Sequence, residues 1–202
     1  MTSQHFFIDG PTGKLEAAAT MPDSECRGIA LVAHPHPLYG GTMDNKVVTT
    51  LAKTFSRLGL AAFRLNFRGV GQSAGEFDHG IGETGDMLAL ADHARRELGD
   101  LPILLAGFSF GGYVQTRVLE QVEAQRLVLV APAVKRFEVG AVPADTLVIH
   151  GEQDEVVPLA DVLDWARPQN LPLTVVPGAG HFFHGQLNLL ARIVTDTCLR
   201  LH

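Results

Sequence analysis

Several features that would mark other classes of protein are scarce in this sequence of 202 residues. It has only two cysteines, Cys26 and Cys198, which lie far apart and match no metal-binding or redox spacing. No apolar run approaches the ~20 residues that a membrane-spanning helix needs. The formal net charge is −6, which gives no basic surface for nucleic acid or an anionic membrane. We therefore expect a small-molecule partner, no nucleic acid and no membrane.

The sequence also lacks the signs of export or of several domains. Residues 1–5 contain no basic region followed by an apolar segment, so we expect no secretory signal. With so few cysteines, the expectation is a cytoplasmic protein with reduced thiols. Hydrophobic residues make up 46% of the chain and charged residues 19%, which is typical of a compact enzyme. The length predicts a single domain over residues 1–202, whose oligomeric state the sequence leaves open.

Apolar strand patterns alternate with helix patterns along most of the chain. The expected strands are 6–8, 14–20, 28–34, 61–67, 101–106, 126–132, 146–151 and 173–176, and the expected helices are 42–58, 83–98, 112–120, 159–166 and 183–201. The first two strands read as an antiparallel hairpin. The alternation from residue 28 onward predicts an α/β fold with a mostly parallel sheet and helices on both faces. In such sheets the site lies at the carboxyl ends of the strands.

The most informative stretch is the Gly-x-Ser-x-Gly motif at residues 107–111, centred on Ser109. It stands between an apolar strand pattern and a helix pattern, which is the setting of a nucleophile elbow. The sharp turn would strain Ser109, and glycine at both flanking positions leaves room for it. We interpret Ser109 as a candidate nucleophile.

A serine hydroxyl needs a base to take its proton and an acid to orient that base. Asp154 follows the expected strand 146–151 and is the candidate acid, with Glu152 and Glu155 as its rivals. His181 follows the last expected strand and is the candidate base, with His184 as its rival. The small residues before His181 suit a tight loop that presents the imidazole.

An oxyanion hole needs two backbone N–H groups. Phe110, the residue after the candidate nucleophile, should give one, and the other should come from the loop 34–41. Two prolines in this loop have no N–H to give. The remaining candidates are His36, Leu38, Tyr39, Gly40 and Gly41, among which we favour Leu38 or Tyr39.

Further residues near these groups are expected to contact the substrate. They are His36, Gly40, Phe108 and His184. Arg68 could meet an anionic substrate, but a structural role is the stronger reading. Only about 13 residues, 133–145, separate two of the expected strands, which is too few for a lid domain. We therefore expect an open, shallow site for small acyl esters.

These motifs together resemble a known family. The matching segments are 34–37 with Gly40 and Gly41, 66–73, the 107–111 elbow, 151–158, and Gly180 with His181. Their order over nearly the whole chain resembles the α/β-hydrolase fold of small, lidless bacterial serine esterases, close to dienelactone hydrolases. The resemblance implies ester hydrolysis without a cofactor, by a triad of Ser109, Asp154 and His181. Dienelactone hydrolases carry cysteine as nucleophile, so the resemblance does not assign their substrate to this chain.

Three alternatives stay open. The same triad could serve a thioesterase or an acyltransferase. Four histidines, His34, His36, His181 and His184, could gather at one sheet edge and hold zinc, although no carboxylate stands at metal-ligand spacing beside them. The fold could also serve as a binding protein without activity. Because all three triad residue types are present, we expect a serine hydrolase that binds no metal.

Overall fold

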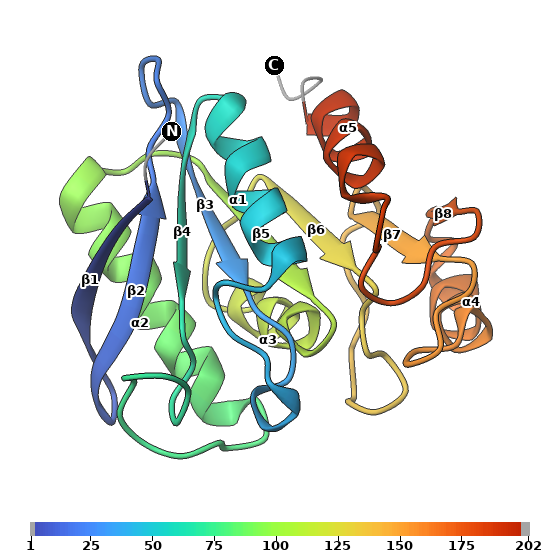
Figure 1. The fold of residues 1–202 in the computed structure, drawn as a ribbon, viewed down its shortest axis with the longest axis horizontal. Helices are drawn as coiled ribbons and strands as arrows, with labels where there is room; N and C mark the ends of the chain where they lie inside the picture. Colours follow the sequence, from blue (N-terminus) through green and yellow to red (C-terminus); the bar gives the residue numbers. More distant parts are fainter. Residues whose placement is uncertain (1–2, 199–202) are drawn as a thin grey trace.

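The computed structural model describes residues 3–198, and its centre is an eight-stranded sheet (Figure 1). The strands are β1 (Ser3–Gly10), β2 (Gly13–Thr20), β3 (Gly28–Ala33), β4 (Leu60–Leu65), β5 (Ile103–Phe108), β6 (Arg126–Val130), β7 (Leu147–Gly151) and β8 (Leu173–Val176). Their order across the sheet is β1-β2-β4-β3-β5-β6-β7-β8. β2 pairs antiparallel with both of its neighbours, and all other pairs are parallel. The predicted α/β-hydrolase fold with an N-terminal antiparallel hairpin is confirmed.

Helices cover both faces of this sheet. They are α1 (Lys46–Arg57), α2 (Ile81–Leu98), α3 (Phe110–Leu119), α4 (Leu159–Ala166) and α5 (Leu187–Cys198), with short 3-10 turns η1 (Pro37–Tyr39) and η2 (Arg167–Gln169). In Figure 1, α1 and α5 lie in front of the sheet, and α2 and α3 lie behind it. Side chains of α1 and α5 share one hydrophobic cluster, and those of α2, α3 and α4 share another.

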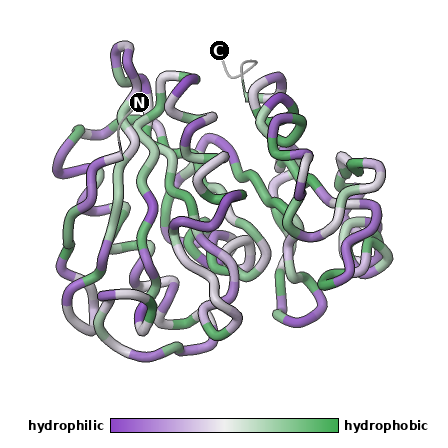
Figure 2. The backbone as a smooth tube through the Cα atoms, viewed as in Figure 1, coloured by the Kyte–Doolittle hydropathy of each residue, from purple (hydrophilic) through white to green (hydrophobic). Residues whose placement is uncertain are grey.

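The two clusters follow from the period of the strands, because successive side chains point to opposite faces. On β3, Ile29 and Leu31 join the cluster beneath α2 and α3, whereas Ala30 and Val32 join the cluster beneath α1. A parallel strand buried on both faces therefore needs an unbroken apolar run. Figure 2 shows the result: hydrophobic residues concentrate in the central strands, and hydrophilic residues in the outer loops.

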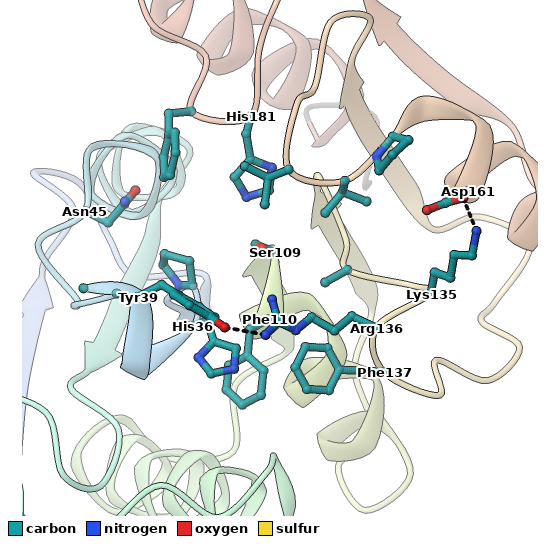
Figure 3. Close-up of a pocket in the computed structure, with 18 residues that line it drawn as sticks. His36, Tyr39, Asn45, Ser109, Phe110, Lys135, Arg136, Phe137, Asp161 and His181 are labelled. Carbon is teal, nitrogen blue, oxygen red and sulfur yellow. Dashed lines mark hydrogen bonds and ion pairs between the residues drawn. The ribbon is translucent and has the colours of Figure 1, made fainter.

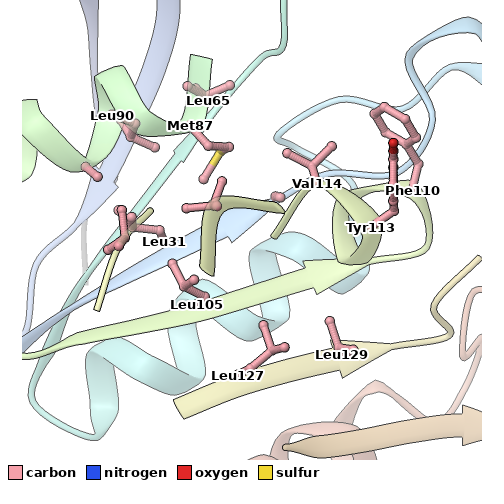
Figure 4. Close-up of a cluster of buried hydrophobic side chains, with 14 of the residues drawn as sticks. Leu31, Leu65, Met87, Leu90, Leu105, Phe110, Tyr113, Val114, Leu127 and Leu129 are labelled. Atoms are coloured by element: carbon pink, nitrogen blue, oxygen red, sulfur yellow. The ribbon is translucent and has the colours of Figure 1, made fainter. Parts of the chain in front are cut away.

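The larger cluster ends directly beneath the candidate nucleophile. Figure 4 shows leucines of β3, β4, β5 and β6 packed against Met87 and Leu90 of α2 and Val114 of α3. Phe110 and Tyr113, both on α3, extend this cluster toward the carboxyl ends of the strands. The start of α3 is thus anchored in a packed interior, which keeps the turn before it in place.

Two helices begin later in the chain than expected. α1 begins at Lys46 because Asn45 caps it: its side-chain oxygen accepts a hydrogen bond from the Val47 amide at 2.9 Å. α5 begins at Leu187 because Phe183 has φ +51°, a left-handed conformation that a helix cannot contain. Residues 199–201 of the expected last helix lie outside the described residues. So do residues 1 and 2 of the segment 1–5, in which we expect no secretory signal.

Within the described chain, the segment from residue 131 to residue 146, between β6 and β7, contains no helix or strand. It is too short and too irregular to form a lid domain, which agrees with the expectation from the sequence. The carboxyl ends of the strands are left accessible from this side.

Among residues 3–198, no helix combines the length and the apolar character needed to cross a membrane.

Candidate functional site

Ser109 lies in the sharp turn between β5 and α3, with φ +55° and ψ −117°. This backbone conformation is strained for a residue with a side chain. A Cβ added at Gly107 would meet the backbone of Gly111, and one added at Gly111 would meet the backbone carbonyls of Ala33 and His34. Glycine at both positions is therefore required for the turn, which presents Ser109 at the floor of a pocket.

Asp154 follows β7 and is held by backbone amides. Its Oδ1 accepts hydrogen bonds from the amides of Val156 at 2.9 Å and Val157 at 2.7 Å, and its Oδ2 lies 2.8 Å from His181 Nδ1. Burial alone would raise the pKa of Asp154, but the hydrogen bonds from His181, Val157 and Val156 outweigh it and hold this pKa below its usual value. The carboxylate is thus ionised in a buried position.

His181 stands in the loop after β8, with only 2% of its surface exposed. Because an ionised Asp154 can only accept, Nδ1 of His181 carries the proton of their hydrogen bond. Nε2 is then the nitrogen that can take a proton from Ser109. The two side chains line the same pocket and face one another across it (Figure 3). No hydrogen bond joins them in the described chain, which is common before a substrate is bound.

The rival residues take other positions around this pair. Glu155 Oε2 accepts from the backbone amide of His181 at 3.3 Å, and Glu152 Oε2 accepts from the amide of Gly178 at 2.8 Å. Both glutamates therefore hold the backbone of the histidine loop rather than the imidazole. His184 is exposed, stacks on Phe182 at 5.8 Å between ring centres, and does not line the pocket.

The loop after β3 folds into η1, which uses most of its amides. The Leu38 amide donates to His36 Nδ1 at 3.2 Å, and the Tyr39 amide donates to the His36 carbonyl at 3.1 Å. The amides of Gly40 and Gly41 donate to the carbonyls of Pro37 and His36.

These bonds leave neither Leu38 nor Tyr39 an N–H for a substrate oxygen, so our preference for them as oxyanion donors is corrected. Of the five candidates, only His36 has an amide without an acceptor in residues 3–198. Phe110, as the first residue of α3, also has an N–H with no partner inside its helix. The pair of available amides is therefore Phe110 and His36.

Two other buried histidines support the site without reaching the pocket. His34 Nδ1 donates to the Pro35 carbonyl at 2.6 Å, and its Nε2 accepts from the Phe67 amide at 3.0 Å. Complete burial lowers the pKa of His34 to about 3, so its ring is neutral. His150 Nε2 donates to the Val157 carbonyl at 2.9 Å and lies 3.5 Å from Asp154 Oδ2. Burial likewise lowers the pKa of His150.

The pocket has a volume of about 600 Å³, within the range of small-molecule sites. Of the expected substrate contacts, His36 and Gly40 line it, and so does Tyr39. Phe108 does not: it points from β5 into the core, is fully buried, and packs under His181 at 4.9 Å between ring centres. Its expected contact with substrate is therefore corrected to a support for the imidazole.

The sequence reasoning missed the wall of the pocket opposite η1. Lys135, Arg136 and Phe137 form it (Figure 3). All three belong to the segment between β6 and β7, which was judged only by its length. Two adjacent cations and an aromatic residue in a short loop at the carboxyl end of a strand were the available signal. Arg68 lies elsewhere, in a buried pair with Asp86 at 2.8 Å, which is a structural role.

The histidines do not assemble a metal site. In the part of the chain that the structure describes, no three His, Cys, Asp or Glu side chains lie together as metal ligands. His34 bonds to two backbone groups, and His181 bonds to Asp154. The imidazoles are thus placed for hydrogen bonding.

Comparisons with known proteins show the family and the fold. The model of a family described as "Serine aminopeptidase, S33" matches residues 38–139. A crystal structure from Xanthomonas campestris, described as an α/β serine hydrolase without lid, is 39% identical, covers 99% of this chain and 95% of its own, and has a TM-score of 0.93. An α/β serine hydrolase homologue from Coxiella burnetii is 41% identical, with 97% of each chain covered and a TM-score of 0.89.

An uncharacterized protein of Rickettsia prowazekii (strain Madrid E) is also similar, with 33% identity over 94% of this chain and 86% of its own. The family match spans half of this chain, and the two solved structures span nearly all of it. Together with the elbow and the lidless sheet, these findings confirm the resemblance that the motifs indicated. This chain belongs to the α/β-hydrolase superfamily, as a serine hydrolase of the S33-type family without a lid.

Proposed function

We propose that this protein hydrolyses small carboxylic esters through a covalent acyl-enzyme formed on Ser109. The observation that carries the proposal is the 2.8 Å hydrogen bond between Asp154 and His181, at a pocket whose floor is Ser109 in its elbow. A buried, ionised carboxylate on Nδ1 makes Nε2 the basic nitrogen of the imidazole.

In the acylation step, His181 Nε2 takes the proton of Ser109 as Oγ attacks the ester carbonyl carbon. The carbonyl oxygen becomes an oxyanion, which the amides of Phe110 and His36 stabilise. Both N–H groups are available before substrate arrives, so little reorganisation is needed in the transition state. The imidazolium is stabilised by Asp154, and it then gives its proton to the leaving alcohol.

In the deacylation step, His181 takes a proton from water, and the resulting hydroxide attacks the acyl carbon. The second tetrahedral intermediate uses the same two amides. When it collapses, His181 returns its proton to Ser109 and the carboxylic acid leaves. Every proton moves through Nε2, which is why one fixed tautomer of His181 serves both steps.

The surroundings of Ser109 favour esters over peptides with a free N-terminus, the substrates that the family description suggests. The α-ammonium group of such a peptide would need an unpaired carboxylate in the pocket to bind it. The pocket offers Asp161, but its Oδ1 is already 3.0 Å from Lys135 Nζ, and Arg136 stands beside that lysine. A third cation would be repelled there.

The absence of a lid between β6 and β7 bears on the size of the substrate. The pocket opens directly from the sheet edge, and its volume of about 600 Å³ suits a small ester. We therefore expect no interfacial activation by lipid surfaces. A marked preference for long-chain lipids would contradict this part of the proposal.

The proposal is tested by replacing the nucleophile. Ser109→Ala should lower the turnover of short para-nitrophenyl esters by roughly a thousandfold or more, because the covalent step is lost. Ser24→Ala, at an exposed serine, is the matched control and should keep full activity. Circular dichroism should show both variants folded. Retained activity in folded Ser109→Ala would overturn the proposal.

The same assay separates the alternatives on this triad. Adding thioesters or competing alcohols shows whether the acyl group goes to water or to another acceptor. A much higher kcat/KM for thioesters, or acyl transfer that outruns hydrolysis, would redefine the reaction as thioester cleavage or acyl transfer. Both outcomes would keep Ser109 as the nucleophile.

A further inference from the structure

Two adjacent cations line the pocket, and only one of them is neutralised. Lys135 Nζ lies 3.0 Å from Asp161 Oδ1 and forms an ion pair with it. Arg136 Nη2 instead donates to the uncharged Tyr39 hydroxyl at 2.6 Å, with the guanidinium carbon 4.8 Å from the centre of the Tyr39 ring. Among residues 3–198, no carboxylate forms an ion pair with Arg136. One positive charge in the pocket is therefore unbalanced.

The guanidinium is exposed at the mouth of the pocket, where its contacts with the Tyr39 hydroxyl and ring hold it. Figure 3 shows Arg136 reaching from the side of Phe137 to Tyr39, and Arg136 lines the same pocket as Ser109. The hydrogen bond to Tyr39 connects the two walls of the pocket. It uses only one guanidinium nitrogen, so the other N–H groups stay available to a ligand.

The neighbouring His36 ring does not add a second unpaired charge. Burial first, and then the charge of Arg136, lower the pKa of His36, which keeps its ring neutral at pH 7. The whole chain carries a formal net charge of −6, so a positive pocket runs against the overall balance. A planar guanidinium with free N–H groups matches the two oxygens of a carboxylate.

We propose that Arg136 binds a carboxylate group of the substrate, so that the preferred esters carry a carboxylate on their acyl or alcohol part. This inference rests on the proposed esterase activity and adds its substrate class. The half-buried Phe137 ring, which packs 5.1 Å from the buried Phe110 ring between centres, offers an apolar surface for the part of the substrate between the ester and the carboxylate.

The test compares matched esters that differ only in this charge. On the acyl side, the pair is the para-nitrophenyl ester of glutarate and that of monomethyl glutarate. On the alcohol side, the pair is the butyrate ester of para-hydroxybenzoate and that of its methyl ester. The measured quantity is the ratio of kcat/KM for the anionic ester to that for the neutral ester, after subtraction of spontaneous hydrolysis.

We expect the wild-type protein to prefer the anionic ester in at least one pair. Arg136→Gln should lower that ratio by roughly threefold to tenfold, and Arg136→Lys by less, because lysine keeps the charge but loses the planar fork. Arg192→Gln, at an exposed arginine of α5 outside the pocket, changes the net charge equally and should leave the ratio unchanged. Added salt should reduce the wild-type preference.

The inference would be overturned by a wild-type ratio of one or less in both pairs, or by an equal loss on both members of a pair in Arg136→Gln. The neutral esters keep this result separate from the proposed function. If the protein hydrolyses them through Ser109 but shows no anionic preference, only the substrate class fails. If it hydrolyses neither member and Ser109 is inert, the esterase proposal fails as well.

Discussion

Three carboxylates lie around the His181 loop, and their hydrogen bonds separate their roles. Asp154 reaches the imidazole because two amides of the following turn fix its other oxygen. Glu152 and Glu155 are long enough to reach the backbone of the same loop and bond there. A residue-level pattern of acids after a strand could name the candidates, but only the folded turn decides which one meets the ring.

His34 is a second residue whose type suggested one role and whose hydrogen bonds give it another. A histidine at the carboxyl end of a strand suggested a group near the chemistry. Its two hydrogen bonds instead tie the Pro35 carbonyl to the Phe67 amide, across the loops after β3 and β4. A neutral ring can make both bonds at once, because one nitrogen donates and the other accepts. Protonation would break the bond from Phe67.

This predicts that His34 makes the fold sensitive to acid. Its pKa falls from 6.5 to about 3 on folding, so the unfolded chain binds a proton between these values and the folded chain does not. The stability from this group is full above pH 6.5 and is lost as the pH falls toward 3, at up to about 1.4 kcal/mol per pH unit. Urea unfolding at pH 7 and pH 5 measures the slope.

His34→Gln is the informative variant, because glutamine can still accept from the Phe67 amide but does not titrate. It should be less stable at pH 7 and show a shallower loss of stability toward pH 5. Asp154 does not contribute to the change in stability between pH 7 and pH 5. Its pKa is lowered from 3.8, so its own contribution changes below that pH. An unchanged slope in His34→Gln would contradict the role given to this histidine.

At the scale of elements, the β5–α3 turn is the part that the sequence predicts best. Its signal is local in the sequence, because the two glycines, at residues 107 and 111, flank Ser109 within five residues. Both positions require glycine because a Cβ there would collide with neighbouring backbone atoms. Helix starts are harder to predict. The start of α1 depends on which of several polar residues caps it, and the start of α5 depends on the left-handed backbone of Phe183.

The turn gives a matched pair of glycine substitutions. Gly111→Ala should lower the free energy of unfolding by roughly 2 kcal/mol or more, because the new Cβ would lie 2.6 Å from the His34 carbonyl oxygen. Gly112→Ala, one residue further into α3, would place its Cβ 3.5 Å from its nearest neighbours and should be neutral or stabilising, because alanine favours a helix. Urea denaturation compares the two. Equal effects would show that the close approach of the backbone does not matter.

At the scale of the whole molecule, the order of the strands explains what could be foreseen. Parallel strands end at one edge, so residues that follow β5, β7 and β8 were expected to meet, and the pocket does bring Ser109 and His181 together. The oxyanion donors could not be predicted this way, because the hydrogen bonds of η1 decide which amide stays available.

The charged wall of the pocket escaped prediction for a related reason. Arg136 and Tyr39 lie 97 residues apart in sequence, and no local pattern links them. Their contact exists only because β6 and β3 both end at the site, with β5 between them. Periodicity predicts which residues enter the core, whereas a pocket is formed by loops whose conformation depends on the complete fold.

The central claim is that Ser109, His181 and Asp154 act as one unit, and active-site labelling tests it most directly. The protein is treated with a fluorophosphonate, and the rate and position of the adduct are measured by mass spectrometry. We predict a single adduct on Ser109, formed roughly a hundredfold or more slowly in Asp154→Asn and at nearly the wild-type rate in Glu155→Gln. An adduct at another residue, or equal rates in wild type and Asp154→Asn, would contradict the account.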